Sequence, residues 1–330
     1  MQISRRTLAA ALPVLLLAAT ASTSTLAQAD YPQRPIKLIV PFAPGGSTDI
    51  VARLVADKMR TTLGQSVVVD NRAGVGGMIG TEVVARAEPD GYTIGIGTVS
   101  TLTVNPLLLK ANRVDPLKDL APITALAAVP SVFAVNPAFG PRNFKDVVAE
   151  IRSKPDQYNM GSSGPGSISH LLIEAMNTDL KFKLRHIPYR GMGPAITAAL
   201  SGETQVYSDQ YPSAAPHIKS GKMVAFAVGA NQRLADLPEV PTFKELGYAD
   251  LNTLAMTWFG LVVPAKTPAA IQAKLHKAAT EALRDPALLA RLKELGVDPV
   301  GNSPEAFRKQ IVDGLALNTR IIKAANISAE

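Results

Sequence analysis

The sequence contains no cysteine, which excludes disulfide bonds, a thiol nucleophile and thiolate metal ligands. Histidine is also scarce, and the spacing of a metal site is not found among the four residues His170, His186, His217 and His276. Lysine and arginine do not cluster with aromatic side chains, which make up 5% of the 330 residues. The composition therefore predicts no metal ion, no cofactor and no nucleic-acid partner.

The sequence motifs of common enzymes are absent or incomplete. The glycine-rich run at residues 74–80 misses the dinucleotide fingerprint because Ile79 stands where the third glycine is required. The run at residues 161–165 misses the hydrolase elbow because Pro165 replaces its second glycine. No serine has a base partner that the sequence reveals. These gaps argue against an enzyme.

The N-terminal segment has the features of an export signal. Arg5 and Arg6 precede an apolar run at residues 8–19, and Ala-Gln-Ala follows at residues 27–29. The run is shorter than the roughly 20 residues of a membrane span, and Ala-x-Ala fits signal-peptidase cleavage. Residues 1–29 are therefore interpreted as a signal peptide and the protein as periplasmic. The paired arginines leave both the general secretory (Sec) and the twin-arginine export routes open.

Removal of this segment leaves about 300 residues, the size of one large domain or of two lobes. The formal charge falls from +7 to +5, because the segment carries two arginines and no acidic residue. This moderate positive balance suits an anionic ligand or an anionic membrane surface.

Residues 36–49 have the pattern of a strand, a loop and a helix. The apolar part, bounded by prolines, predicts a buried strand of a parallel sheet. Gly45 and Gly46 allow a sharp turn, and Ser47 or Thr48 can cap the helix, whose first N–H groups are free to bind an anion. The pattern indicates either an anion pocket or a strand-to-helix turn without a ligand.

A second loop of this kind lies at residues 161–170, where glycines and serines separate a predicted strand at 158–160 from a helix. A third candidate is the hydroxyl-rich segment 98–101. It follows the predicted strand 92–97 and so lies where open α/β sheets bind ligands. Two similar loops, one in each half of the chain, favour a shared pocket.

Strands and helices alternate along most of the chain, as in an α/β fold with a parallel sheet. Residues 116–130 read as short apolar pieces broken by prolines. A predicted strand follows at 131–136, and the apolar strand 257–263 is the candidate for a return crossing between lobes. Polar residues before prolines predict three C-terminal helices, which open at 267–268, 285–286 and 303–304.

Five ordered motifs cover nearly the whole mature chain: YPxRPIxLIVPFxPGGxTD at 31–49, VVxNRxGxGGxIG at 68–80, PDGYT at 89–93, the serine-rich loop through Ser169 and His170, and WFGLVVPAxTP at 258–268. Together they resemble the substrate-binding proteins of tripartite tricarboxylate transporters, the Bug or TctC-like receptors. The resemblance implies an α/β, two-lobed periplasmic binding protein of type II. Each lobe would be a mixed sheet flanked by helices, with a two-strand hinge between them. The implied division is residues 30–127 and 256–330 for lobe 1 and residues 128–255 for lobe 2.

The resemblance also implies a ligand and its site. Members of the family bind carboxylated metabolites, such as di- or tricarboxylates, acidic amino acids or aromatic carboxylates, through backbone N–H groups, hydroxyls and ordered waters. The implied ligand-binding residues are Phe42, Ala43, Gly45, Gly46, Ser47, Thr48, Thr98, Ser100 and Thr101 in lobe 1, and Ser162, Ser163, Gly166, Ser167, Ser169 and Asp209 in lobe 2.

Two positions depart from the family pattern. Ala43 replaces a common second proline, and Tyr-Ser-Asp-Gln at 207–210 replaces the commoner Phe-Asp-Asn. Asp209 either accepts a hydrogen bond from the ligand or caps the helix that follows it. Tyr189 and Arg190 are expected at the rim, where Arg190 is either a partner for a second carboxylate or a solvated loop charge.

These features predict a monomeric periplasmic receptor, not an enzyme. It captures a small carboxylate between its lobes and presents it to a membrane transporter of the tripartite tricarboxylate type or to a sensor. A ligand that contacts both lobes only when they are closed stabilises the closed form. The alternative is an exported α/β enzyme that acts on a carboxylated substrate. A regulator's effector domain is disfavoured by the export signal.

Overall fold

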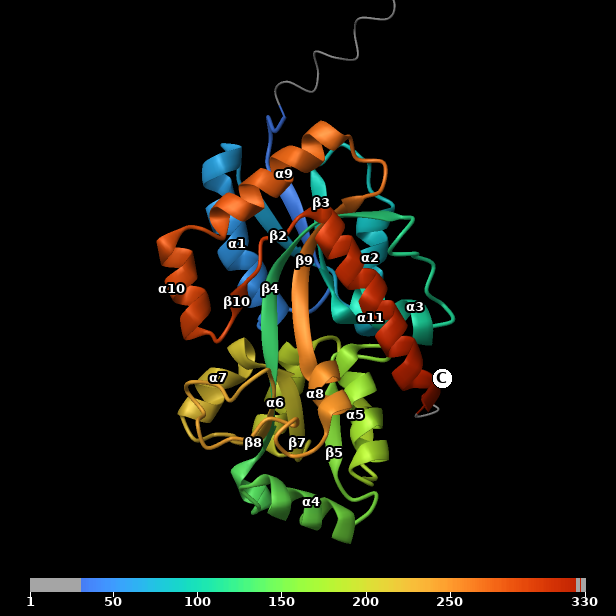
Figure 1. The fold of residues 1–330 in the computed structure, drawn as a ribbon, viewed down its shortest axis with the longest axis vertical. Helices are drawn as coiled ribbons and strands as arrows, with labels where there is room; N and C mark the ends of the chain where they lie inside the picture. Colours follow the sequence, from blue (N-terminus) through green and yellow to red (C-terminus); the bar gives the residue numbers. More distant parts are fainter. Residues whose placement is uncertain (1–30, 325–326, 328–330) are drawn as a thin grey trace, which may run out of the picture.

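Two strands, β4 (Leu120–Val135) and β9 (Met256–Pro264), run along the long axis of the molecule and connect its two lobes (Figure 1). The computed structural model describes residues 31–324 and 327, so the predicted signal peptide lies outside the described residues. Among the described residues, no helix has both the length and the apolar character that crossing a membrane requires.

The first lobe contains a mixed sheet in the order β2-β1-β3-β9-β4, with β10 paired to β4. Strands β1, β2 and β3 are parallel, and β9 is antiparallel to both of its neighbours. The remaining strands of this lobe are β1 (Ile36–Val40), β2 (Val67–Asn71), β3 (Thr93–Thr98) and β10 (Asp298–Pro299). Its helices are α1 (Ser47–Leu63), α2 (Met78–Ala85), α3 (Asn105–Leu108), α9 (Ala269–Ala282), α10 (Pro286–Glu294) and α11 (Pro304–Ala324).

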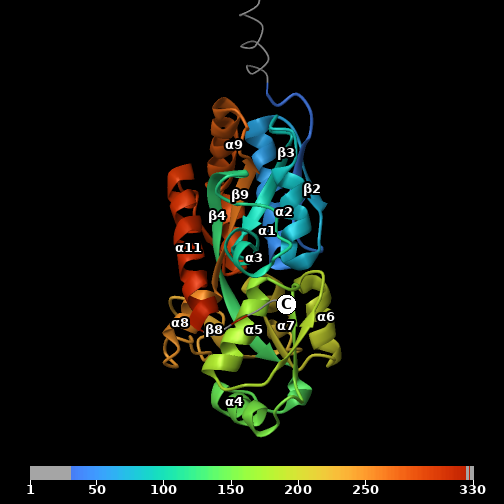
Figure 2. The same cartoon turned by 90° about the vertical axis from the view of Figure 1, so that its right-hand side faces the viewer.

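Both faces of this sheet are covered, as the continuous apolar strands predict. Successive side chains of a strand point to opposite faces, so Leu38 and Val40 of β1 join one core and Ile39 joins the other. The first core includes buried residues of α1, α9 and α10, and the second includes residues of α2 and α11. In Figure 1, α2 and α11 both lie to the right of β9, and Figure 2 separates them, with α11 to the left of β4 and α2 to the right of β9.

The second lobe continues the sheet in the order β4-β7-β5-β6, and β8 also pairs with β4. Strands β5, β6 and β7 are parallel, whereas β4 is antiparallel to β7 and β8. The strands are β5 (Asn159–Ser162), β6 (Arg185–Pro188), β7 (Val206–Gln210) and β8 (Val224–Gly229). The helices are α4 (Phe144–Ser153), α5 (Ile168–Asp179), α6 (Met192–Ser201), α7 (Tyr211–Lys219) and α8 (Ala249–Ala255).

Strand β4 corrects the expectation of short broken pieces at residues 116–130. It is a continuous strand of 16 residues that pairs with β9 in its first part and with β7 and β8 from Ser131 onward. Pro122 lies beside a register shift, where the ladder tolerates a residue without an N–H group. Pro122 and Pro130 therefore lie within one long strand and do not end it.

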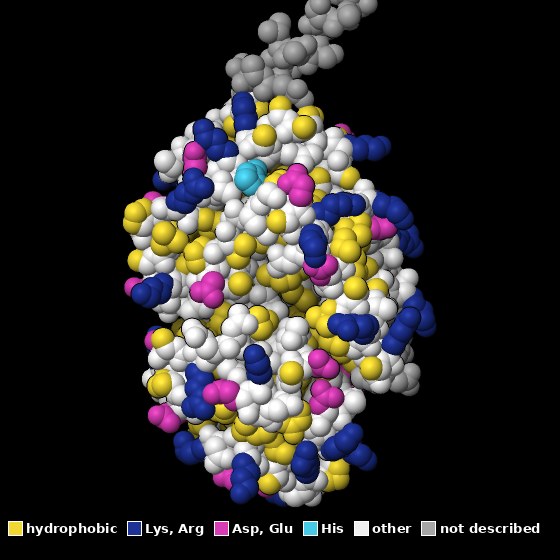
Figure 3. Space-filling model, in the orientation of Figure 1, with side chains coloured by type: hydrophobic (Ala, Val, Ile, Leu, Met, Phe, Trp, Pro, Cys, Tyr) yellow, Lys and Arg dark blue, Asp and Glu magenta, His cyan; other side chains and the backbone are white. Residues whose placement is uncertain are grey.

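The other predicted elements agree with the structure in kind. Helices α10 and α11 begin at Pro286 and Pro304, directly after the predicted caps, whereas α9 begins at Ala269, one residue later than predicted, with Pro268 as its N-cap. Helix α8, which was not predicted, packs its buried Leu251 and Leu254 against the core of the second lobe. On the face shown in Figure 3, basic and acidic side chains are interspersed over both lobes.

Candidate ligand-binding site

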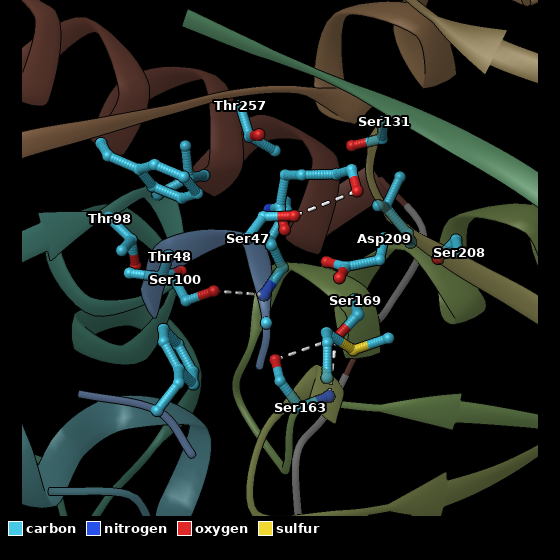
Figure 4. A pocket seen from close by; sticks show the side chains of 18 of the residues that line it. Ser47, Thr48, Thr98, Ser100, Ser131, Ser163, Ser169, Ser208, Asp209 and Thr257 are labelled. Carbon is cyan, nitrogen blue, oxygen red and sulfur yellow. Dashed lines mark hydrogen bonds between the residues drawn. The ribbon is translucent and has the colours of Figure 1, made fainter. Parts of the chain in front are cut away.

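A cavity lies between the two lobes, where the chain segments that follow β1, β3, β5 and β7 meet (Figure 4). The space open to the centre of a water molecule is about 30 Å³. Nine of the predicted site residues line it: Phe42, Gly46, Ser47, Thr48, Thr98 and Ser100 from the first lobe, and Ser163, Ser169 and Asp209 from the second. The cavity therefore brings the three predicted loops together.

The first wall of the cavity is the start of α1. Gly45 adopts a φ of 88°, which only glycine adopts readily, and the chain then enters the helix. The prediction that Ser47 or Thr48 caps α1 is wrong, because Gly46 is the N-cap residue and no side chain caps this helix. Both hydroxyl residues lie in the first turn, beside N–H groups that have no intrahelical acceptor. This arrangement leaves several N–H donors for an anion.

The segment after β3 forms a π-helical turn at Ser100–Val104 in place of the expected loop. Thr98 and Thr101 hydrogen-bond each other's N–H groups through their side chains, with N–O distances of 3.0 and 3.3 Å. The Thr101 hydroxyl is engaged within this turn, and Thr101 does not line the cavity. Its side chain positions Thr98 and Ser100, which do.

The serines of the loop between β5 and α5 divide into two groups. Ser167 caps α5 by accepting from the N–H of His170, and its hydroxyl donates to the Gly164 carbonyl. Ser163 and Ser169 face the cavity, and their hydroxyl oxygens are 3.1 Å apart. Ser167 therefore orders the loop, while the other two serines reach the cavity. Gly166 also does not line the cavity, and its backbone N–H helps to order the loop by donating to His170.

Ser162 lies behind this loop and does not line the cavity. Its Oγ is 2.5 Å from Nε2 of His186, whose ring stacks on His170 with the centroids 4.1 Å apart. Burial, followed by repulsion from His170, lowers the pKa of His186 to about 4, and burial also lowers the pKa of His170. The sequence did not reveal this serine–histidine contact because its partners are 24 residues apart.

Asp209 lies at the carboxyl end of β7 with 5% of its surface exposed. The Tyr207 hydroxyl donates to its Oδ2 at 3.3 Å, and the Ser213 hydroxyl donates to the same oxygen. Burial raises the pKa of Asp209 to about 7. The N-cap residue of α7 is Gln210, so Asp209 contacts the first turn of this helix without being its cap.

Four hydrogen bonds cross between the lobes around the cavity. The Ser47 hydroxyl donates to the Gln210 carbonyl and accepts from the Ser213 N–H, both at 3.1 Å. The N–H of Ile168 donates to Ser100 Oγ at 2.9 Å. The N–H of Ala43 donates to the Arg190 carbonyl at 3.3 Å. The lobes are therefore closed on each other in this structure.

The predicted rim residues lie outside the cavity. Tyr189 and Arg190 line a separate surface depression with Val75 and Pro165. The Tyr189 hydroxyl donates to Glu203, and the Arg190 side chain is exposed. Of the first-lobe residues, Ala43 and Gly45 also do not line the cavity.

The sequence did not predict several residues that line the cavity. They lie on the hinge strands, on β7, α5 and α6, and in the segment after β3. The polar ones are Ser131, Ser208, Gln210 and Thr257, and the apolar ones are Val99, Ile168, Leu172, Met192, Trp258 and Phe259. Ser208 Oγ is buried and has no hydrogen-bond partner among the described residues. For Ser208 and Gln210, the one indication in the sequence was the departure from the family pattern at residues 207–210.

The two lobes, the two-strand hinge and the cavity between them define the class of periplasmic binding proteins. The sequence profile described as "Tripartite tricarboxylate transporter family receptor" matches residues 51–327. The chain belongs to this family of solute-binding receptors, as the motifs predicted.

Three solved structures are similar over nearly the whole chain. The periplasmic binding protein BugD is 35% identical, with a TM-score of 0.87 over 90% of this chain and 99% of its own. Rpa4515 of R. palustris, solved with adipate, is 30% identical, with a TM-score of 0.86 over 90% and 99%. MatC of Rhodopseudomonas palustris, solved with bound malate, is 31% identical, with a TM-score of 0.84 over 88% and 100%.

Proposed function

We propose that this protein is a periplasmic receptor that binds a small carboxylated metabolite in the cavity between its lobes. The closed, loaded form is presented to a membrane transporter of the tripartite tricarboxylate type or to a sensor. Family membership and the similarity to proteins solved with malate and adipate support this proposal. We further propose that the receptor is a monomer exported by residues 1–29, and that the chain crosses between lobes near residues 128 and 256.

The observation that carries the proposal is the kind of donor around the cavity. The first turn of α1 offers N–H groups with the positive end of the helix dipole, and hydroxyls come from Thr48, Ser131 and Ser163. A carboxylate is stabilised by several such donors without a cationic side chain. Ordered water can bridge the remaining distance at low cost.

The lobes supply the mechanism of capture. A carboxylate that accepts from α1 on one lobe and from Ser163 on the other makes its full set of contacts only in the closed form. Ligand binding therefore shifts the population toward closure, by no more than the difference in its affinity for the two forms. A partner that binds the closed form reads out the presence of the ligand.

The direct test is calorimetric titration of the mature protein with malate, adipate, citrate, glutamate and benzoate. The variants Thr48→Val and Ser163→Ala each remove one hydroxyl from the cavity wall. Each is expected to weaken binding of the preferred ligand by about tenfold, the value of one charge-assisted hydrogen bond. Thr61→Val, an exposed position at the other end of α1, is the matched control and is expected to bind normally.

Two outcomes would contradict the proposal. Unchanged affinity in both cavity variants would place the ligand elsewhere. Mass spectrometry of the protein incubated with a stabilising ligand detects any new product. Conversion of the ligand into such a product would favour the alternative hypothesis of an exported enzyme. The Ser162–His186 contact is the feature to mutate in that event.

A further inference from the structure

The Asp209 carboxyl points toward the centre of the cavity, across from Ser47 and near Ser163 and Ser169 (Figure 4). Both side-chain hydroxyls that contact it, those of Tyr207 and Ser213, donate to Oδ2. Oδ1 receives no side-chain hydrogen bond from the described residues, and the backbone of Gln210 also hydrogen-bonds the carboxyl group. Oδ2 is therefore held by two side chains, whereas no side chain holds Oδ1, which can bind a ligand.

No lysine, arginine or histidine is found among the described residues that line the cavity. The charged and titratable groups on the surrounding elements are engaged elsewhere. On α1, Asp49 pairs with Arg53 at 2.9 Å. On α5, His170 accepts from the Gly166 N–H and stacks on His186.

The elements on the other sides of Asp209 also bring no compensating charge. On α7, the Tyr211 hydroxyl donates to Asp236, which pairs with Lys219 near the far end of that helix. The adjacent segments of β4 and β9 contribute Ser131 and Thr257, which are not ionisable. A negative charge on Asp209 would therefore be buried without a cation, which is costly.

Burial is the largest influence on the pKa of Asp209 and raises it to about 7, against the hydrogen bonds from Ser213, the Gln210 backbone and Tyr207. In a cavity this small, an ionised Asp209 would also repel a ligand carboxylate. A protonated carboxyl group instead donates a short, charge-assisted hydrogen bond to such a ligand.

We propose that Asp209 binds the ligand as a neutral carboxylic acid, with the proton on Oδ1 donated to a carboxylate oxygen of the ligand. The inference rests on the proposed receptor function and specifies its ligand as a carboxylate without an amino group at this end. Above neutral pH, the proton comes from solvent, so binding takes up one proton. The receptor therefore binds more tightly as the periplasm becomes more acidic.

The experiment is calorimetric titration with malate and adipate at about pH 6 and about pH 8.5, in pairs of buffers that differ in ionisation enthalpy. We expect uptake of close to one proton per ligand at the higher pH and much less at the lower pH. Affinity is expected to fall about tenfold for each pH unit above neutrality, because an ever smaller fraction of Asp209 is protonated.

Two variants separate this role from a structural one. Asp209→Asn keeps an N–H donor in place of the acid proton, and it is expected to retain affinity at low pH while losing both the proton uptake and the pH dependence. Asp57→Asn, an exposed position on α1, is the matched control and is expected to behave as the wild type. Urea unfolding of each variant establishes that it is folded before titration.

The failures are distinguishable. Binding of a dicarboxylate with no proton exchange and the same affinity at both pH values would overturn the role of Asp209 and leave the receptor function standing. Tight binding of an amino acid with no proton uptake would show an ionised Asp209 paired with an ammonium group, which also overturns it. If no carboxylate binds at any pH, both proposals fall.

Discussion

At the scale of single residues, the second lobe holds buried ionisable side chains in their uncharged forms. His170 and His186 are stacked behind the serine loop, and burial lowers the pKa of each. Protonation of either ring would place a poorly solvated charge beside its neighbour. The loop that carries Ser163 into the cavity is thus supported by a pair of neutral imidazoles.

This pair is expected to make the protein sensitive to acid. Because the pKa of His186 is lowered to about 4, its contribution to stability is complete above the unfolded-state pKa of 6.5 and is lost as the pH falls toward 4. The free energy of unfolding falls between pH 7 and pH 4. In His186→Gln this fall is expected to be smaller by about 1 to 2 kcal/mol, a value reduced to allow for the partial exposure of the side chain. Urea unfolding across this pH range measures the effect.

The control for this prediction is His276→Gln on α9, which lies away from the stacked pair. An effect that occurs in His186→Gln and not in this variant assigns the change to the stacked pair. If the free energy of unfolding falls equally in His186→Gln and in the wild type as the pH is lowered, protonation of carboxylates alone causes the fall.

At the scale of elements, closure depends on glycines that bring backbone against backbone across the lobes. A side-chain carbon on Gly193, in the first turn of α6, would lie 2.4 Å from the Pro44 carbonyl oxygen of the first lobe. One on Gly76 would lie 2.4 Å from the Pro165 carbonyl oxygen. The loop of one lobe and the helix start of the other therefore fit together only because these positions lack a side chain.

Gly193→Ala is expected to hold the lobes apart without harming the fold. Gly193 does not have the positive φ that would strain an alanine, whereas the clash with Pro44 exists only when the lobes are closed. Ligand affinity should fall by about ten- to a hundredfold, because part of the binding energy must then overcome the clash. Calorimetry with the ligand found for the wild type provides the measurement, and unfolding temperature without ligand should not fall.

The control on the same helix is Thr197→Ala, which lies on the exposed surface of α6. It is expected to bind as the wild type does. Normal affinity in Gly193→Ala would mean that the ligand-bound lobes do not approach as closely as they do in this structure.

At the scale of the whole molecule, the proposed function requires the two lobes to open and close on each other. Strands β4 and β9 are the covalent links described here, and hydrogen bonds such as those of Ser47 add to the closed form. Ser47 faces the cavity, yet its hydroxyl is used to join the first lobe to α7. We therefore expect Ser47 to act in the proposed capture by stabilising closure.

Ser47→Ala is expected to weaken ligand binding by about tenfold, because two hydrogen bonds of the closed form are lost at roughly 1 kcal/mol each and are partly replaced by water in the open form. X-ray scattering should show a smaller fraction of compact molecules at a fixed ligand concentration. Ser220→Ala, at an exposed position after α7, is the control. A change in affinity without any change in the scattering would instead indicate direct contact between Ser47 and the ligand.

The α/β class, the openings of the three C-terminal helices to within a residue, and the family were accessible from the sequence. The turn at Gly45 and Gly46, the cap at Asp285, and the apolar run of β1 are local features, so each is encoded within a few neighbouring residues. The recurrence of a serine- and glycine-rich loop also led to the correct segments of the cavity. Local chemistry therefore indicated which segments line the cavity.

Only the tertiary structure decided which side chains of those segments reach the cavity. Adjacent serines point apart, so Ser162 contacts His186 while Ser163 faces the cavity. Ser131 and Thr257 reach it from the hinge, where β4 and β9 pair across more than a hundred residues of sequence. Burial between the lobes raises the pKa of Asp209 to about 7. Burial and orientation depend on contacts between distant parts of the chain, and these contacts leave no local pattern in the sequence.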